Sequence, residues 1–311
     1  MLTNYAAYIG NPVIKLFHEA DLPLEVFGSI FKTVIGEGDS AVDMFITAET
    51  QTHLGFATRK IYALAAIFGG APNLEHAQHL LEQNSELVAT KWGVVARNDG
   101  MQLAFIYATV PAEANVWENM MSVSEAALMM RSQLYDPTQL MVLKMLDQAG
   151  MKRQMPHLTC IDTEATDNRH LELVIKNAGL GYKVDLDMNR ILVTIDLPNG
   201  RWQTCYLWLS PLSAAFFGDE KLIFLGSPGI AADEVGDGEG LSLEVMNMLL
   251  NESGELENGG WQIQPNGGAA LALFGMWIAS QPEEGVLMNA LNHVAQTADR
   301  LEERLTGEDN W

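Results

Sequence analysis

The chain has 311 residues, enough for two domains of ordinary size, and its 48% hydrophobic content is typical of a soluble globular protein with buried cores. Forty acidic and 18 basic side chains give a formal net charge of -22, which repels nucleic-acid phosphates and anionic membrane surfaces. The composition therefore excludes nucleic acid and membrane as expected partners, whereas a basic protein segment is compatible with it.

The cellular compartment is predicted from the absence of three sequence features: a membrane span, a signal peptide and a paired cysteine motif. The longest apolar run, residues 61–71, is too short to span a bilayer, which needs about 20 residues. The first ten residues show no basic start followed by an apolar stretch, as a signal peptide would. Two cysteines, Cys160 and Cys205, form no paired motif and are expected to be buried thiols. We expect a cytoplasmic protein.

The first half of the chain predicts a helix over "NPVIKLFHEADL", three strands between residues 24 and 70, and a second helix from residue 74. A strand hairpin follows, with its turn at Asn98-Asp99-Gly100, and then a helical stretch that begins "NVWENMM". Residues 136–160 read as a joining segment, helical at its start.

The second half predicts the same succession more clearly. A helix over 167–180 precedes two alternating strands, "YKVDLDM" and "ILVTIDL", that meet at Asn189-Arg190. The third strand is "WQTCYLWL", and an acidic glycine-rich loop is expected over 227–240. A helix over 241–251, a hairpin over 261–279 and a long amphipathic helix complete the chain.

The two halves also share residues. When Trp92 is aligned with Trp261, residues 74–92 and 243–261 are identical at seven of 19 positions without a gap. The separation of 169 residues is far longer than a solenoid repeat, so the pattern indicates a duplicated domain. We predict an α+β fold of two tandem α-β-β-β-α-β-β-α domains, each an antiparallel sheet packed with helices. Their expected bounds are 1–135 and 161–311, with 136–160 as a partly helical linker.

Motifs of catalysis and cofactor binding are missing from the sequence. There is no P-loop, no dinucleotide glycine motif and no nucleophile elbow. His76 and His79 have helical spacing for a metal, but their aligned partners Val245 and Met248 are apolar, which favours a packing role. The carboxylate pairs Glu283-Glu284 and Glu302-Glu303 are expected at a helix start or on a solvated face. We expect no catalytic residue, no metal and no cofactor, although a site assembled from distant residues stays open.

Large aromatic residues give the strongest indication of a binding surface. Alternation along the third strand places Trp202, Tyr206 and Trp208 on one face, and Trp277 ends an apolar face of the last strand. Helices in a single layer cover one side of a small antiparallel sheet, so these four residues are our candidate client-binding site. The alternative is that both faces are buried against the other domain.

The element order in an acidic, cysteine-poor unit resembles the type III secretion chaperone fold, which the CesT-type chaperones and YbjN-like proteins share. The likeness is carried by "GWQIQPNGGAALALFGMWIASQPEE" and "LNHVAQTADRLEERL", and it covers most of 165–305 and, more weakly, 5–135.

The resemblance implies a non-enzymatic protein that holds an extended client segment against sheet and helix surfaces, without nucleotide. Members are usually homodimers of one unit, whereas this chain fuses two, which implies a monomeric pseudo-dimer or a homodimer. The acidic surface favours a client rich in lysine and arginine. A structural or regulatory module that assembles with itself or with a folded partner is the alternative function.

Overall fold

The computed structural model divides the chain into two compact units. Unit 1 comprises Met1–Ala71 and Thr90–Met155, and unit 2 comprises Pro72–Ala89 and Pro156–Trp311. The structure describes residues 11–19, 21–35, 42–48, 50–53, 56–68, 73–85, 90–96, 102–111, 169–186, 190–210, 222–232, 240–256, 258–266, 269–279 and 284–307. The predicted linker, residues 136–160, and the helix expected from "NVWENMM" lie outside these ranges.

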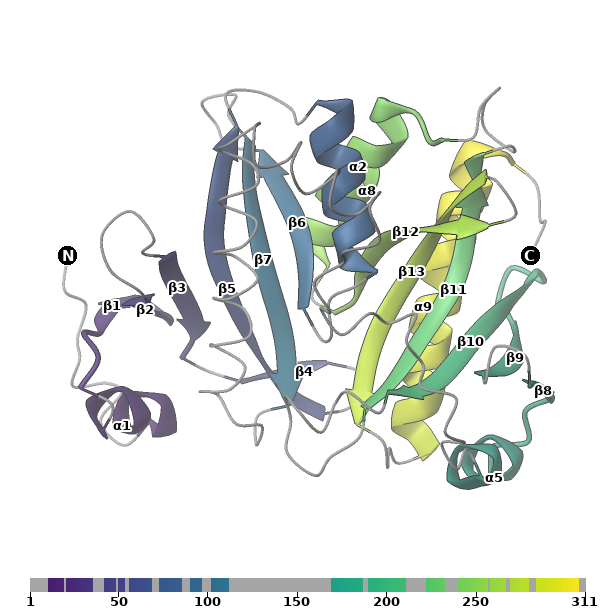
Figure 1. Cartoon of the computed structure of the whole chain (residues 1–311). Coiled ribbons are helices and arrows are strands. Elements are labelled where there is room, and N and C mark those ends of the chain that lie inside the picture. The colour runs from purple at the N-terminus through teal and green to yellow at the C-terminus, as the bar shows by residue number, and fades with distance from the viewer. Residues whose placement is uncertain are drawn as a thin grey trace. The chain divides into compact units, whose positions relative to one another are not determined.

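Unit 1 is an antiparallel sheet with one described helix, α1 (Pro12–Glu19) (Figure 1). Its strands are β1 (Glu25–Phe27), β2 (Ile30–Ile35), β3 (Val42–Thr47), β4 (Gln51–His53), β5 (Phe56–Phe68), β6 (Thr90–Ala96) and β7 (Gln102–Pro111). They run in the order β1-β2-β3-β5-β7-β6, and β4 pairs with β5 beside this path. The Asn11 side chain caps α1 by accepting from the Val13 N–H and donates to the Ala48 carbonyl, so it ties the helix to the end of β3.

Unit 2 contains a six-stranded antiparallel sheet and four described helices (Figure 1). The helices are α2 (Leu74–Asn84), α5 (Arg169–Asn177), α8 (Leu243–Glu255) and α9 (Glu284–Leu305). The strands are β8 (Tyr182–Asp185), β9 (Arg190–Asp196), β10 (Trp202–Ser210), β11 (Leu222–Ala231), β12 (Gly260–Asn266) and β13 (Ala269–Ala279). Their order is β12-β13-β11-β10-β9-β8, so the chain order along the two sheets is the same when β4 is set aside.

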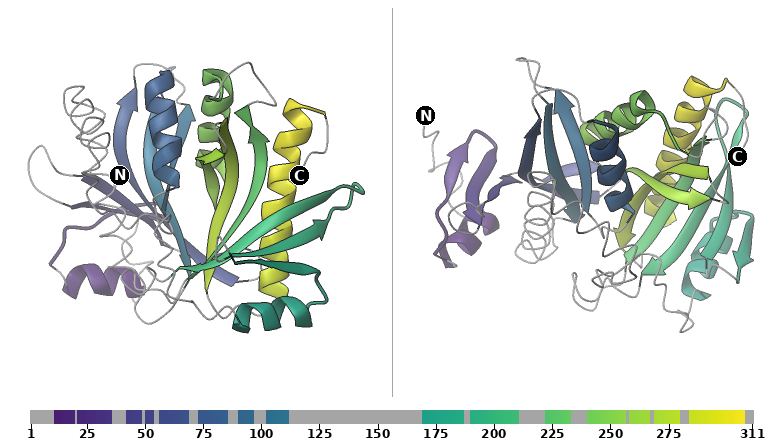
Figure 2. Two further views of the ribbon diagram at one scale, coloured as in Figure 1. Left: turned by 45° about the vertical axis from the view of Figure 1, so that its right-hand side comes forward. Right: turned by 45° about the horizontal axis from the view of Figure 1, so that its top comes forward.

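Helix α9 covers one face of the unit 2 sheet (Figure 2). Its apolar residues recur at steps of three and four and are all buried: Leu287, Ala290, Leu291, Val294, Ala298 and Leu301. Each buried leucine contributes about 1.5–3 kcal/mol by removing apolar area from water. This helix therefore makes the face that it covers a buried core.

The coarse prediction of an α+β protein with antiparallel sheets is confirmed. The element order differs, because β11 occupies residues that we expected in the 227–240 loop, and five strands lie between residues 24 and 70, where three were expected. Ser227-Pro228-Gly229 has the composition of a turn. In the structure, the register shifts between Pro228 and Ile230, which is the kind of irregularity where a strand tolerates proline. A Cβ on Gly229 would lie 2.7 Å from the Trp261 ring, so packing selects this glycine.

Candidate functional site

Strand β10 presents two contrasting faces. Gln203, Cys205 and Leu207 are buried towards α9, where the Cys205 thiol contacts the Leu291 carbonyl at 3.8 Å. Trp202 and Tyr206 alternate with them and lie on the other side, which we call the open face. No helix in the described part of unit 2 covers the open face over β8, β9 and β10. Trp202 is 46% exposed there, whereas Tyr206 is half-buried.

The pairing register extends the open face across the sheet. Trp208 lies opposite Phe224 on β11, and Phe224 lies opposite Trp277 on β13. Directly opposed residues of antiparallel strands share a face, so three of the predicted aromatic positions belong to two adjacent rows of one face. The structure describes the backbone of Trp208 and Trp277 but not their side chains.

The centre of the open face is built around Phe224. This ring is fully buried with Leu273, and Tyr206 packs against both. A Cβ on Gly226 would lie 2.6 Å from the Phe224 ring, and one on Gly275 would lie closer still to the same ring. The two glycines therefore let the ring lie close to the backbone of β11 and β13. The face is apolar and buried at its centre and becomes exposed towards Trp202.

Charged groups border the aromatic residues on the β8 side. The Arg190 guanidinium lies 4.3 Å from the centre of the Tyr206 ring, and its Nε is 3.0 Å from an Asp185 carboxylate oxygen. Burial raises the pKa of the Tyr206 phenol, so it remains a neutral hydrogen-bonding group at physiological pH. Guanidinium–aromatic stacking of this kind holds Tyr206 in one orientation.

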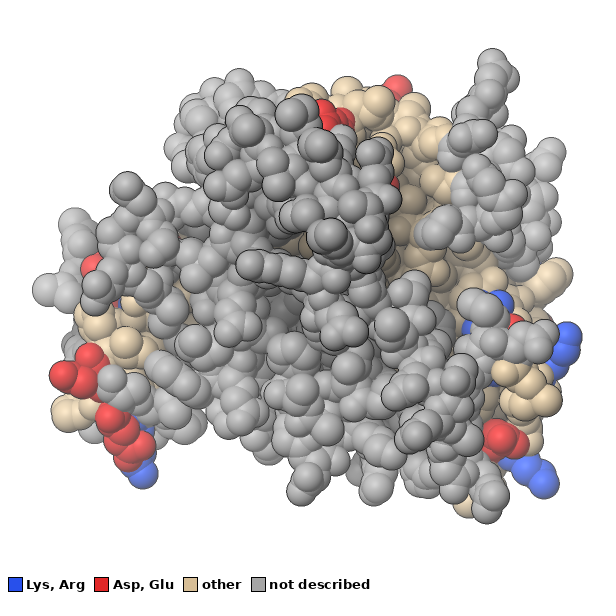
Figure 3. Space-filling view, in the orientation of Figure 1, with Lys and Arg blue, Asp and Glu red and all other residues tan. Residues whose placement is uncertain are grey.

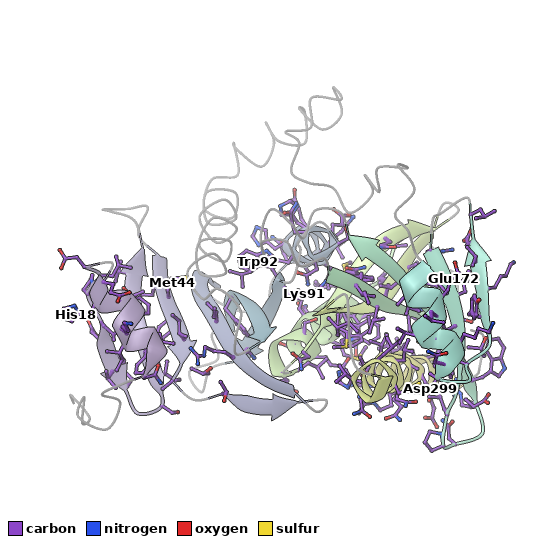
Figure 4. All side chains as sticks on the ribbon, turned by 90° about the horizontal axis from the view of Figure 1, so that it is seen from below. His18, Met44, Lys91, Trp92, Glu172 and Asp299 are labelled. Atoms are coloured by element: carbon purple, nitrogen blue, oxygen red, sulfur yellow. The ribbon has the colours of Figure 1, made fainter. Side chains whose placement is uncertain are left out.

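A buried ionic cluster occupies the opposite, α9-covered face. Arg201 lies between two carboxylates of α9, 2.7 Å from Asp299 and 3.3 Å from Glu302. Gln203 donates to Glu302, and Ser227 donates to Gln203. Our expectation that Glu302 is solvated is wrong, because it is 0% exposed. Asp299 is marked on α9 in Figure 4. The cluster fixes α9 on β10 and β11.

The two edge strands of the unit 2 sheet differ in what covers them. At the β12 edge, the Trp261 backbone N–H donates to Ser253 Oγ of α8 at 2.8 Å, and its carbonyl accepts from Asn84 Nδ2 of α2 at 2.8 Å. The Trp261 indole N–H donates to Glu252 at 2.7 Å. Side chains thus occupy the hydrogen-bonding groups that another strand would need. At the β8 edge, Tyr182 and Lys183 are exposed.

The edge closure escaped our sequence reasoning, although the repeat contains its signal. Asn84 and Ser253 are aligned residues of the two copies, and both converge on Trp261. Each is a buried polar residue within an otherwise apolar helix face. Two aligned buried polar positions on equivalent helices indicate a shared polar target.

The described side chains that could bind a metal or react with a substrate do not cluster. Within the described ranges, no group of three or more His, Cys, Asp and Glu residues is arranged to hold a metal ion. Burial lowers the pKa of His76, against a smaller raising effect of Glu75. Burial raises the pKa of Cys205 to about 12, which keeps the thiol protonated and unreactive. In unit 1, burial lowers the pKa of Lys91 to about 7.

Comparisons with known protein families, curated proteins and solved structures find no match for this chain. None of the helices that the structure describes combines the length and apolarity needed to cross a bilayer.

Proposed function

We propose that the chain is a non-enzymatic chaperone or adaptor of two tandem, secretion-chaperone-like domains, and that it holds an extended client segment on the open face of unit 2. The tandem is supported by the identical chain order of the two sheets and by the aligned tryptophans Trp92 and Trp261, both fully buried on a terminal strand. Helices α2 and α8 are aligned elements of the two copies.

The observation that carries the binding proposal is the exposure of Trp202. The fully buried large side chains include Trp92 and Trp261, whereas Trp202 remains 46% exposed on the same face of β10 as half-buried Tyr206. An aromatic ring next to an apolar centre and a polar rim is the composition of a binding hot spot. Covering such a ring with a client contributes roughly 1.5–3 kcal/mol by area.

The border of the face fits an extended peptide. Thr194 and Asp196 are exposed on β9, beside Trp202 and Thr204 on β10. Such side chains offer hydrogen-bond donors and acceptors along an extended backbone. The net charge of -22 favours encounter with a lysine- and arginine-rich segment, so low ionic strength should raise the association rate.

The test begins with copurification from the native host and mass spectrometry of bound proteins. Peptides of the recovered clients are then titrated calorimetrically against the wild type and Trp202→Ala. We expect Trp202→Ala to weaken peptide binding at least tenfold, which corresponds to about 1.4 kcal/mol. Phe27→Ala is the matched control, because Phe27 is an aromatic of similar exposure in unit 1. Binding of folded partners but of no peptide would instead support a structural or regulatory module.

A further inference from the structure

The free edge of β8 has properties that client binding on the open face does not use. Within the described part of unit 2, β9 is the only strand that pairs with β8, so the sheet ends there. Tyr182 is 38% exposed, and Leu186, just past the strand, is 85% exposed. Figure 3 shows acidic and basic side chains mixed over α5, β8 and β9. Exposed apolar residues next to both charge signs favour a protein partner.

The sequence of this edge is complementary to itself. Residues 182–186 read Tyr-Lys-Val-Asp-Leu, so an apolar residue stands at each end and at the centre, with one cation and one anion between them. An antiparallel copy centred on Val184 places Tyr182 opposite Leu186, and Lys183 opposite Asp185. Every pair is then apolar with apolar, or positive with negative.

We propose that the β8 edge pairs antiparallel with the β8 edge of a second copy of this chain, with Val184 opposite Val184. The two-fold axis runs through this residue and makes the contact isologous. Lys183 and Asp185 project to the open face, because Asp185 lies opposite Arg190. Tyr182 and Val184 project to the side where Tyr182 donates to Glu172 of α5, and pairing that extends β8 by one residue would place Leu186 on that side too. Both exposed apolar residues are buried at once.

The charges on β8 explain why this edge would pair with β8 of a second copy and not with other strands. A lysine on an edge strand disfavours indiscriminate pairing with other strands. Asp185, two residues further, offers a matched anion only in the self-complementary register. Asp185 is already 3.0 Å from Arg190, so the incoming Lys183 places a second cation beside the same carboxylate. The terminal strand of unit 1, β1, reads Glu-Val-Phe and carries no such pairing.

The β8 pairing does not depend on the proposed client binding, but its consequence for a client rests on that proposed function. Because the axis is perpendicular to the joined sheet, both open faces lie on the same side. Two Trp202 residues would then border one continuous surface, which gives a client two equivalent binding sites.

Association of the full chain is tested by sedimentation equilibrium. The wild type is expected to dimerise, and Lys183→Glu, which puts two acidic residues opposite each other at two places, should weaken the dimer at least tenfold. Lys15→Glu is the control: it makes the same charge change on an exposed helix of unit 1. A wild type that stays monomeric at its highest soluble concentration overturns the proposal, as does a dimer equally weakened by both variants.

The register is tested by cross-linking in a Cys160→Ser background. Opposed residues in an antiparallel pair have Cα atoms about 4.5–5.5 Å apart, within the disulfide range of about 4.4–6.8 Å. Val184→Cys should therefore give an intermolecular disulfide under mild oxidation. Lys183→Cys should not, because its two copies are displaced by about 7 Å along the strands. Circular dichroism establishes that both variants fold. Cross-linking of Lys183→Cys but not of Val184→Cys overturns the register.

Discussion

The two sheets share their strand order but differ in one row of directly opposed residues that runs across the strands. The row starts at the same aligned position in both sheets. In unit 1 this row begins at buried Lys91, and in unit 2 it begins at the aligned residue, Gly260. The unit 1 row reads Lys91, Tyr107, Tyr62, Phe45 and Lys32. The unit 2 row reads Gly260, Gly275, Gly226, Tyr206 and Leu192.

The comparison shows how one strand order supports two different surfaces. In unit 2 three glycines leave space beside the backbone, and the Phe224 ring lies across two of them, Gly226 and Gly275. In unit 1 the row consists of large and cationic side chains, and Lys32 lies 5.9 Å from the centre of the Phe45 ring. The glycines are therefore specific to the surface of unit 2 and not a requirement of the fold.

The largest effect is expected at a position that the two units share. Trp261→Ala should lower the free energy of unfolding by about 3–5 kcal/mol, because it removes a fully buried ring that packs on Phe274 and bonds Glu252. Chemical denaturation measures this. Trp92→Ala should have a comparable effect in unit 1, where Trp92 is also fully buried. A loss below 1 kcal/mol for only one of them would show that the aligned tryptophans have different roles.

Replacing the buried Lys91 should stabilise the protein, in contrast to the tryptophan substitutions. Its pKa in the folded protein is about 7, below the usual 10.5, because burial disfavours the charged form. Between these values the unfolded chain holds more protons, so stability rises as pH increases from about 7 to 10.5. Lys91→Met should add about 1–4 kcal/mol at pH 7 and flatten this dependence. Denaturation curves of both proteins at several pH values measure this dependence. If the free energy of unfolding depends on pH equally in the wild type and in Lys91→Met, the burial argument is contradicted.

The glycine row is tested by filling it. Gly275→Ala should cost about 1–3 kcal/mol, because its Cβ would overlap the Phe224 ring and force that side chain to move. The double variant Gly275→Ala with Phe224→Leu should recover part of the loss, because the smaller side chain frees space. Thermal unfolding of both variants measures the coupling. Additive losses would mean that Phe224 does not limit Gly275.

The smallest effect is expected at the β12 edge. Asn84→Ala removes the donor to the Trp261 carbonyl and should cost about 1 kcal/mol. Asn84→Ser copies the aligned Ser253 and should retain part of the stability if its shorter side chain reaches the same group. Hydrogen exchange of the β12 amides reports the local opening. Unchanged exchange in Asn84→Ala would show that α8 closes this edge alone.

Sequence periodicity predicted the helices that the structure describes, because burial imposes its period on them directly. The apolar stripe of α9 is an example, since each step of three or four residues marks a buried side chain. The strand β11 was partly missed, because Pro228 and Gly229 have turn propensity and only distant packing keeps them in a strand.

Alignment of the copies also failed to predict which face a residue occupies. Phe105 and Phe274 are aligned without a gap, yet Trp92 lies opposite Ile106, whereas Trp261 lies opposite Phe274. The hairpin loops differ in length, since Ala96 pairs with Gln102 and Asn266 with Ala269. A shift of one residue reverses every side chain of a strand.

For the candidate site, alternation correctly grouped residues of β10 but could not say which group α9 covers. Glu302 illustrates the limit: its charge predicted exposure to solvent, whereas the distant residues Arg201 and Gln203 make its burial tolerable. Pairings between residues about a hundred positions apart leave no trace in local periodicity.

The hydrogen bond between Asn84 and Trp261 joins two residues that are synthesised at very different times. The two residues are 177 positions apart, so at about 5–20 residues per second the ribosome needs roughly 9–35 s to make the second after the first. During that interval α2 has no strand to dock on, and its apolar residues Ala77, Leu80 and Leu81 lack their final neighbours. We therefore expect the nascent chain to expose this apolar helix face to cellular chaperones, and slower translation of the second half should lengthen that exposure.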